Sequence, residues 1–116
     1  MLIAYTAGPY RAITYPQLCG NILIARQVAE SLWRLGFAVI CPHTNSAHFG
    51  ARVPEEKFLP GYLRILEVCD LLVLLPNWEE SSGARAEESF ARKRQIPKYF
   101  WPYNLVELMD LVNGQK

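Results

Sequence analysis

The chain has 116 residues, with 12 basic and 11 acidic side chains and a net charge of +1 at neutral pH. A charge this close to zero gives no electrostatic reason to expect binding to nucleic acid or to an anionic membrane surface. No apolar run approaches the roughly 20 residues of a membrane span, and the N-terminus lacks the pattern of a signal peptide. With three widely spaced cysteines in no zinc-ligand pattern, we expect a single cytoplasmic domain over residues 1–116.

The first third of the chain predicts a strand, a helix and a second strand. Residues 2–7 are apolar and end before a Gly-Pro pair. Thr14 is followed three residues later by Gln, a capping box that predicts the start of a helix. Apolar residues then recur at helical spacing as far as Gly36, a natural helix stop. Residues 37–41 form an apolar run closed by proline, which predicts a buried strand.

The rest of the chain repeats this alternation after a segment without periodicity. Residues 42–54 predict a long functional loop, because loops of about a dozen residues or more in compact domains are more often binding segments than connectors. The following elements are expected to be a helix opening near Pro60, a strand over 70–75, a helix over 83–94, a short strand over 96–101 and a helix from Asn104 to about Val112.

Strands that alternate with helices predict an α/β fold with three layers. The sheet should be parallel, with about four to five strands, right-handed crossovers and helices on both faces. Ligands of such folds bind outside the carboxyl ends of the strands. Residues 8–11, 42–49 and 76–87 follow predicted strands and should therefore converge at one edge of the sheet.

Glu87 is the strongest candidate for a catalytic residue. At about 100° per residue, Ala84, Phe90 and Ala91 share one apolar helix face, with Glu87 in its middle and Glu88 on the opposite side. A buried carboxylate is costly unless something is bonded to it, although the nearby helix N-terminus favours its ionised form. Glu87 is therefore either a nucleophile or general base, or a structural carboxylate held by neighbouring hydroxyls or an arginine.

The turn after the first strand offers a candidate anion site. Gly8 exposes backbone N–H groups, and Arg11 can pair with a phosphate, although an arginine after a turn is commonly only solvated. The chain has neither a dinucleotide-binding fingerprint nor a Walker loop, which argues against an NTPase, a kinase or an ordinary NAD dehydrogenase.

Histidines and a tryptophan complete the candidate pocket. His43 and His48 lie five residues apart without a metal-binding pattern, and we interpret them as hydrogen-bonding or pocket-wall residues. Trp78 can stack on a planar base or pack as a core or lid residue. Gly83 is expected to let the chain turn closely into the next helix, which Ser81 or Ser82 can cap.

Several of these motifs together resemble one known group, the nucleoside 2-deoxyribosyltransferase superfamily. The resemblance is greatest to a small branch related to the 2′-deoxynucleoside 5′-phosphate N-hydrolases, and it spans about Tyr5 to Pro97. It is carried by Tyr5-Thr6-Ala7-Gly8-Pro9-Tyr10-Arg11, Pro42-His43-Thr44-Asn45, Cys69-Asp70, Trp78 and Ser81-x-Gly83-x-x-x-Glu87.

The resemblance implies a flavodoxin-like or Rossmann-like sheet and a homodimer whose partner helps complete the site. It implies N-glycosidic bond cleavage or transfer on a nucleoside or nucleoside 5′-monophosphate, with Glu87 as nucleophile, and Arg11 favours the monophosphate. We expect neither a cofactor nor a metal. Ser81 and Ser82 would orient the sugar. The segment from Gly8 through Pro9 and Tyr10 to Arg11 would lie near a 5′-phosphate, and Gly83, His43 and Trp78 would complete the substrate site.

One position departs from this pattern. The characterised relatives carry an aspartate that assists departure of the base, and Tyr62 stands there in this chain. Tyr62, His43 or Glu79 could take over that role, whereas Asp70 is expected to be structural. The departure motivates an alternative function, a catalytically silent nucleotide-binding or sensing module. An FMN-binding electron carrier fits the fold class alone.

Four aromatic residues near the C-terminus predict either a dimer surface or a cover for the last helix. They are Tyr99, Phe100, Trp101 and Tyr103. This is more aromatic surface than one short sheet edge needs.

Overall fold

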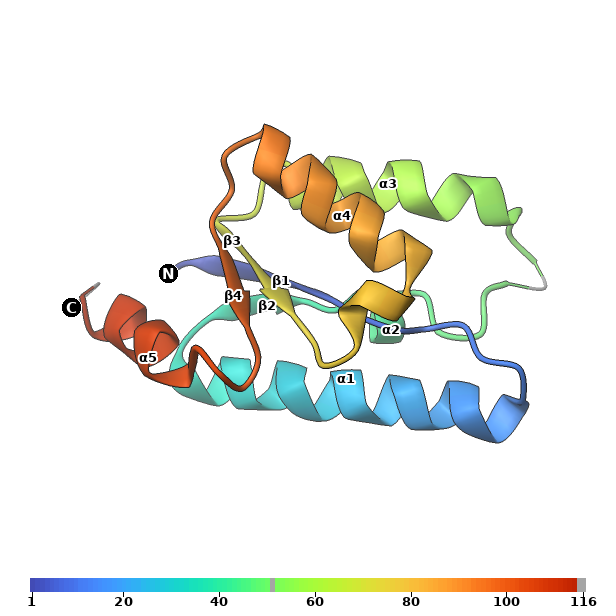
Figure 1. The fold of residues 1–116 in the computed structure, drawn as a ribbon, viewed down its shortest axis with the longest axis horizontal. Helices are drawn as coiled ribbons and strands as arrows, with labels where there is room; N and C mark the ends of the chain where they lie inside the picture. The colour runs from blue at the N-terminus through green and yellow to red at the C-terminus, as the bar shows by residue number, and fades with distance from the viewer. Residues whose placement is uncertain (51, 115–116) are drawn as a thin grey trace.

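The computed structural model describes residues 1–50 and 52–114 and has a four-stranded parallel sheet at its centre (Figure 1). Its strands are β1 (Ile3–Ala7), β2 (Ala38–Ile40), β3 (Leu71–Leu74) and β4 (Lys98–Phe100). All three strand pairs are parallel, and the spatial order is β2-β1-β3-β4. The predicted parallel α/β sheet is therefore confirmed, with the strand order of flavodoxin-like folds.

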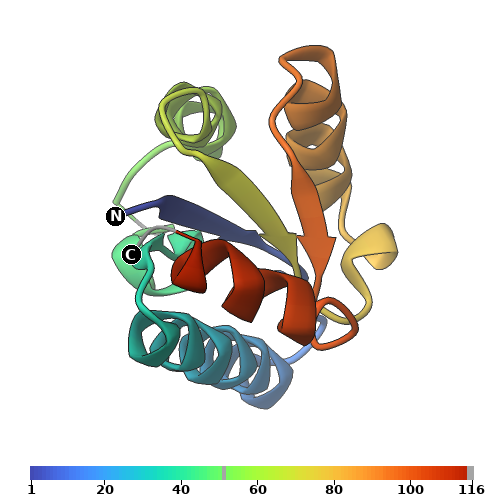
Figure 2. The ribbon, with the colours of Figure 1, turned by 90° about the vertical axis from the view of Figure 1, so that its left-hand side faces the viewer.

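Helices cover both faces of this sheet, so the molecule has three layers (Figure 2). Helices α1 (Tyr15–Leu35) and α5 (Leu105–Asn113) pack on one face, and α3 (Phe58–Leu66) and α4 (Ser82–Lys93) pack on the other. Alternate residues of each strand point to opposite faces, which divides the core into two clusters. Thus Leu71 and Val73 of β3 contact the α1 side, whereas Leu72 and Leu74 contact the α3 and α4 side.

The ends of α1 agree with the signals in the sequence. The Thr14 hydroxyl accepts a hydrogen bond from the Gln17 backbone N–H at 3.3 Å. At the other end Gly36 has a φ of 115°, and a Cβ there would lie 2.9 Å from Val112 Cγ1. Both the left-handed conformation and the close packing therefore require glycine at this stop.

The segment after β2 differs from the prediction of one long loop. Pro42–Asn45 forms a short helix, α2, and Glu55–Lys57 forms a 3-10 turn, η1, that leads directly into α3. Helix α3 therefore begins at Phe58 rather than near Pro60. The first turn of a helix has N–H groups without helical partners, so a proline there costs no hydrogen bond.

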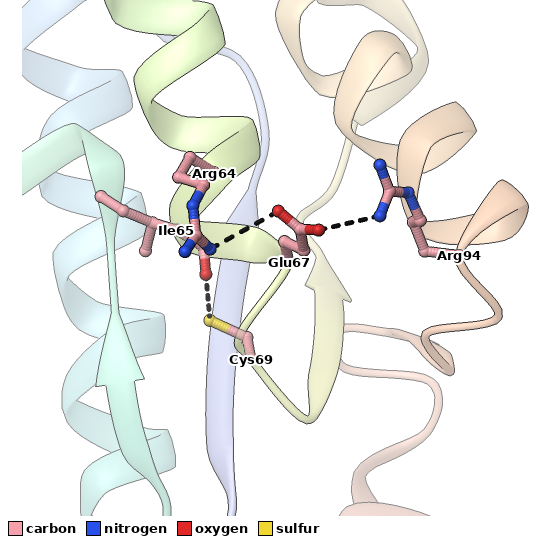
Figure 3. Close-up of polar contacts among 5 residues, drawn as sticks. All are labelled: Arg64, Ile65, Glu67, Cys69 and Arg94. Atoms are coloured by element: carbon pink, nitrogen blue, oxygen red, sulfur yellow. Dashed lines mark hydrogen bonds and ion pairs between the residues drawn. The ribbon is translucent and has the colours of Figure 1, made fainter.

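Polar contacts join α3 and α4 at the end of the sheet where β3 begins (Figure 3). Glu67 pairs with Arg94 of the segment after α4 at 2.8 Å and with Arg64 of α3 at 3.5 Å. Close by, the Asp70 carboxylate accepts a hydrogen bond from the Ile3 N–H at 2.7 Å and ties β3 to β1. This contact gives Asp70 the structural place expected for it.

The aromatic residues near the C-terminus mostly cover the core. Tyr99 and Trp101 pack against the cluster on the α1 and α5 side, and Phe100 packs against the opposite cluster. Only Tyr103 of the four is strongly exposed, at 87%. The interpretation of these residues as a cover for the last helix therefore accounts for Tyr99 and Trp101, whereas Phe100 packs on the sheet face opposite α5. No helix within residues 1–50 and 52–114 is both long enough and apolar enough to cross a membrane.

Candidate functional site

A cavity of about 850 Å³ opens at the carboxyl ends of β1 and β3. Strand order reverses beside β1, so this edge is the topological switch point at which parallel α/β proteins bind ligands. The three segments expected to converge all contribute to the wall, together with residues of α1, η1 and α3. The predicted site residues that line the cavity are Gly8, Pro9, Tyr10, Arg11, His43, Ser81, Ser82, Gly83 and Glu87.

Trp78 is the predicted site residue that lies elsewhere. It belongs to a 3-10 turn, η2 (Trp78–Glu80), and packs beside Phe100 with ring centroids 6.4 Å apart. Asn77 takes a left-handed conformation with a φ of 65° just before this turn, and Asn77 and Glu80 line the cavity instead. Trp78 is therefore a core-packing residue, which is one of the two alternatives expected from the sequence.

The structure shows one of the two interpretations of Glu87, a carboxylate held by a neighbouring hydroxyl, whereas its role as a nucleophile or general base stays a prediction. It lines the cavity, is only 8% exposed, and accepts a hydrogen bond from the hydroxyl of the fully buried Tyr5. Burial raises the pKa of Glu87 to about 7, against the lowering effects of the Tyr5 hydrogen bond and of His43. Burial, followed by the charge of Glu87, raises the pKa of Tyr5, so this hydroxyl remains a proton donor.

The two glycines of the site have different roles. A Cβ on Gly8 would lie 2.7 Å from the Cβ of Leu75, so the close approach of β1 and β3 requires glycine there. At Gly83 the nearest atom to such a Cβ would be Ser81 Oγ at 3.8 Å, an ordinary contact. The expectation that Gly83 is needed for a close turn is therefore wrong. Ser81 caps α4 as expected, since its Oγ accepts from the Ala84 N–H at 3.1 Å.

Arg11 lies at the cavity wall and forms an ion pair with Glu55 of η1. The two side chains are 75% and 62% exposed. The turn that carries Arg11 is anchored from α1, where Asn21 Nδ2 donates to the Tyr10 carbonyl at 3.1 Å. Neither Glu55 nor Asn21 was identified from the sequence. The partner of Glu55 is distant along the chain, and the partner of Asn21 is a backbone carbonyl, which no side-chain pattern reveals.

His43 is almost fully buried beside the same turn, at 3% exposure. Its Nε2–H donates to the Pro9 carbonyl at 2.8 Å, and its ring packs beside that of Tyr10 with the two ring centroids 5.6 Å apart. Burial by itself would lower the pKa of His43, but Cys41 and the Pro9 carbonyl outweigh burial and raise it. Among the described residues, the buried side-chain atoms without a hydrogen-bond partner are His43 Nδ1 and Thr6 Oγ1, and both residues line the cavity.

Tyr62 of α3 projects its hydroxyl into a polar cluster beside α2. The hydroxyl contacts Ser46 Oγ, accepts from Asn45 Nδ2 at 3.2 Å and donates to the Pro42 carbonyl at 3.3 Å. The Tyr62 ring meets the edge of Tyr5, with centroids 6.5 Å apart and planes at 73°. Tyr5 therefore contacts both Glu87 and Tyr62. Sequence reasoning missed Ser46, a residue type too common in loops to give a signal.

Fold and cavity together define the class of protein. It is a three-layer parallel α/β protein with a small-molecule-sized cavity at the switch point and a buried carboxylate in the cavity wall. Within residues 1–50 and 52–114, no three His, Cys, Asp or Glu side chains are grouped so that they could hold a metal ion.

Residues 18–99 match the family described as domain of unknown function DUF4406, and the chain belongs to this family. The matched region contains His43, Tyr62, Ser81 and Glu87, whereas β1 precedes it. No curated protein matches the chain.

Proposed function

We propose that this protein cleaves or transfers the N-glycosidic bond of a nucleoside or a nucleoside 5′-monophosphate, with Glu87 as the nucleophile. The observation that carries the proposal is the carboxylate of Glu87, buried in the wall of a cavity and held by one hydroxyl. The cavity is of the size that encloses small-molecule ligands, which are typically found in pockets of about 300–1,000 Å³.

The reaction takes two displacements at the anomeric carbon. A Glu87 oxygen bonds to that carbon while the C–N bond breaks, and the bonding electron pair leaves with the base, which takes up a proton. Water, or a second base, then attacks the same carbon and releases the carboxylate. Hydrolysis and transfer differ only in this second acceptor.

Two features of Glu87 suit it to this role. With a pKa near 7, a large share of the carboxyl group is ionised at neutral pH although it is buried. The Tyr5 hydroxyl binds Oε2, which fixes the orientation of the carboxylate and directs Oε1 as the attacking atom.

Tyr62 is the best placed of the three candidates to protonate the departing base. Its hydroxyl is at the cavity wall, and the hydrogen bond from Asn45 Nδ2 stabilises the phenolate that forms when the proton leaves. Both protons are donated to backbone carbonyls, that of Tyr62 to Pro42 and that of His43 Nε2 to Pro9. The Tyr62 hydroxyl can rotate its proton toward a departing base, whereas the ring N–H of His43 has a fixed direction. Glu79 is exposed and is not a cavity-lining residue.

The resemblance to the nucleoside 2-deoxyribosyltransferase superfamily supports the same assignment and adds the proposal of a homodimer. Light scattering at micromolar concentration tests the dimer, and a monomeric mass would contradict it.

The activity is tested by incubating the protein at high concentration with deoxy- and ribonucleosides and their 5′-monophosphates. We expect free base to appear, detected by chromatography. If no base appears, but calorimetry detects binding that Glu87→Ala leaves unchanged, the silent binding module is the correct function instead. If neither base release nor binding appears, both functions are wrong.

A further inference from the structure

The charges around the cavity are unequal in sign. Among the described lining residues, the Lys and Arg side chains are represented by Arg11 alone, whereas three carboxylates, Glu55, Glu80 and Glu87, belong to the wall. A 5′-phosphate brings up to two further negative charges, which this wall would repel at short range.

The single arginine is already paired. Arg11 contacts Glu55, and both side chains are largely exposed at the mouth of the cavity. An ion pair this exposed is weak, so a phosphate can compete for the guanidinium. The displaced Glu55 carboxylate would nevertheless remain tethered nearby on η1 and would oppose the phosphate.

The N-terminus of α4 is the other place where a phosphate could bind, and one of its free N–H groups is already bonded. The Ser81 Oγ accepts from the Ala84 N–H, which is one of the free N–H groups that an anion would use. Glu80 lines the cavity just before this helix, and Glu87 follows within its first two turns. Negative charge therefore lies on both sides of this helix start.

We propose that the cavity selects nucleosides with an uncharged 5′ end, and that Glu55 is the specificity-determining residue that rejects 5′-phosphates by neutralising Arg11. The neutral 5′-hydroxyl of a nucleoside can donate a hydrogen bond to a carboxylate such as that of Glu55 or Glu80, and no charge repulsion opposes this contact. This inference rests on the proposed nucleoside-processing function and narrows its substrate class.

Calorimetry on a Glu87→Gln background measures recognition without turnover. The probes are the four common deoxynucleosides and their 5′-monophosphates. We expect each nucleoside to bind more tightly than its monophosphate. Adding Glu55→Gln should strengthen monophosphate binding about fivefold, the effect of removing one nearby charge in a solvent-exposed setting, and should change nucleoside binding by less than about twofold.

Glu56→Gln is the matched control on the same background. Glu56 is the neighbouring exposed glutamate of η1 and is not a cavity-lining residue, so the same charge is removed without affecting Arg11. This variant should leave the binding affinity for nucleosides and for monophosphates unchanged. A fivefold gain for monophosphates in this control would assign the effect to net charge and overturn the role of Glu55.

The inference is also overturned if monophosphates bind more tightly than nucleosides before Glu55 is changed. It is likewise overturned if Glu55→Gln changes the affinity for nucleosides and for monophosphates by the same factor. In either case base release by the wild-type protein would show that the proposed function itself survives. If no nucleoside or nucleotide is bound or cleaved, the proposed function fails and the specificity proposal fails with it.

Discussion

Two adjacent glutamates on α4, Glu87 and Glu88, lie in different environments on the two sides of the helix. Each is 8% exposed. Glu88 contacts two cations, Lys98 of β4 at 3.1 Å and Arg92 one turn further along α4 at 3.4 Å. Glu87 has a hydroxyl partner, Tyr5, and lines the cavity.

The comparison shows that burial alone does not identify a functional carboxylate. Ion pairs with two cations make Glu88 a link between α4 and β4, which is a structural role. Glu87 is buried with a neutral hydrogen-bond donor, so its charge remains costly and available for chemistry. The free energy spent on burying Glu87 is the kind of cost expected at an active site rather than in a core.

The largest difference between the two glutamates should be in activity. Glu87→Gln removes the proposed nucleophile and should lower the rate of base release by about a thousandfold or more, as expected when a covalent step is lost. Glu88→Gln makes the same chemical change one residue away and should keep the rate within about threefold. Equal losses in the two variants would contradict the separation between a catalytic and a structural carboxylate.

The next largest effect should come from Tyr62, the proposed proton donor. Tyr62→Phe should lower base release from ordinary nucleosides by about a hundredfold, a typical contribution of general acid catalysis. A nitrophenyl deoxyriboside, whose leaving group needs no proton, should be cleaved at a nearly unchanged rate. Tyr103→Phe, on an exposed residue, is the control. A uniform loss on both substrates would indicate that Tyr62 only shapes the cavity.

Stability should also separate the glutamates, in a way that depends on pH. Because the pKa of Glu87 rises from 4.5 to about 7 on folding, the folded state binds this proton more tightly than the unfolded chain. Its contribution is therefore favourable below pH 4.5 and is lost as the pH rises to about 7. Glu87→Gln should stabilise the protein by up to about 3 kcal/mol at pH 8 and by little at pH 4.

Thermal unfolding of the wild type and Glu87→Gln at both pH values measures this difference. Since Gln can still accept the Tyr5 hydrogen bond, the comparison isolates the buried charge. A stabilisation that is the same at pH 4 and pH 8 would mean that the charge of Glu87 is not the source.

The smallest effect should be that of Glu88 on stability. Glu88→Gln leaves Lys98, which is 39% exposed, without its carboxylate partner and should destabilise the fold by about 1–2 kcal/mol at pH 7. Urea unfolding detects a change of this size. If Glu88→Gln instead increases stability, the Glu88 carboxylate destabilises the folded state, as the charge of Glu87 is expected to do.

Much of the architecture was predictable because its causes are local. Thr14 and Gly36 mark the two ends of α1 through a side-chain cap and a left-handed residue that neighbouring sequence determines. The apolar runs of β1 and β3 predict strands buried on both faces, and their alternation with helices predicts a parallel sheet. The start of α3 was misplaced because a proline is compatible with more than one position in the first turn of a helix.

The environments of the glutamates were predictable only in part. Helical periodicity put Glu87 on the apolar face, but it put Glu88 on the polar face, where the structure nearly buries it. Lys98 lies ten residues further along the chain and reaches Glu88 only because β4 packs beside α4. Periodicity describes one helix and carries no information about the element that packs against it.

The sequence by itself determined the order of the elements, the parallel sheet and the inward position of Glu87, because these follow from apolar periodicity and capping within short segments. Tertiary structure decided the partners: Tyr5 for Glu87, Glu55 for Arg11, and Phe100 rather than the cavity for Trp78. These partners are separated by tens of residues in the chain, and only the packing of strands and helices brings their side chains into contact.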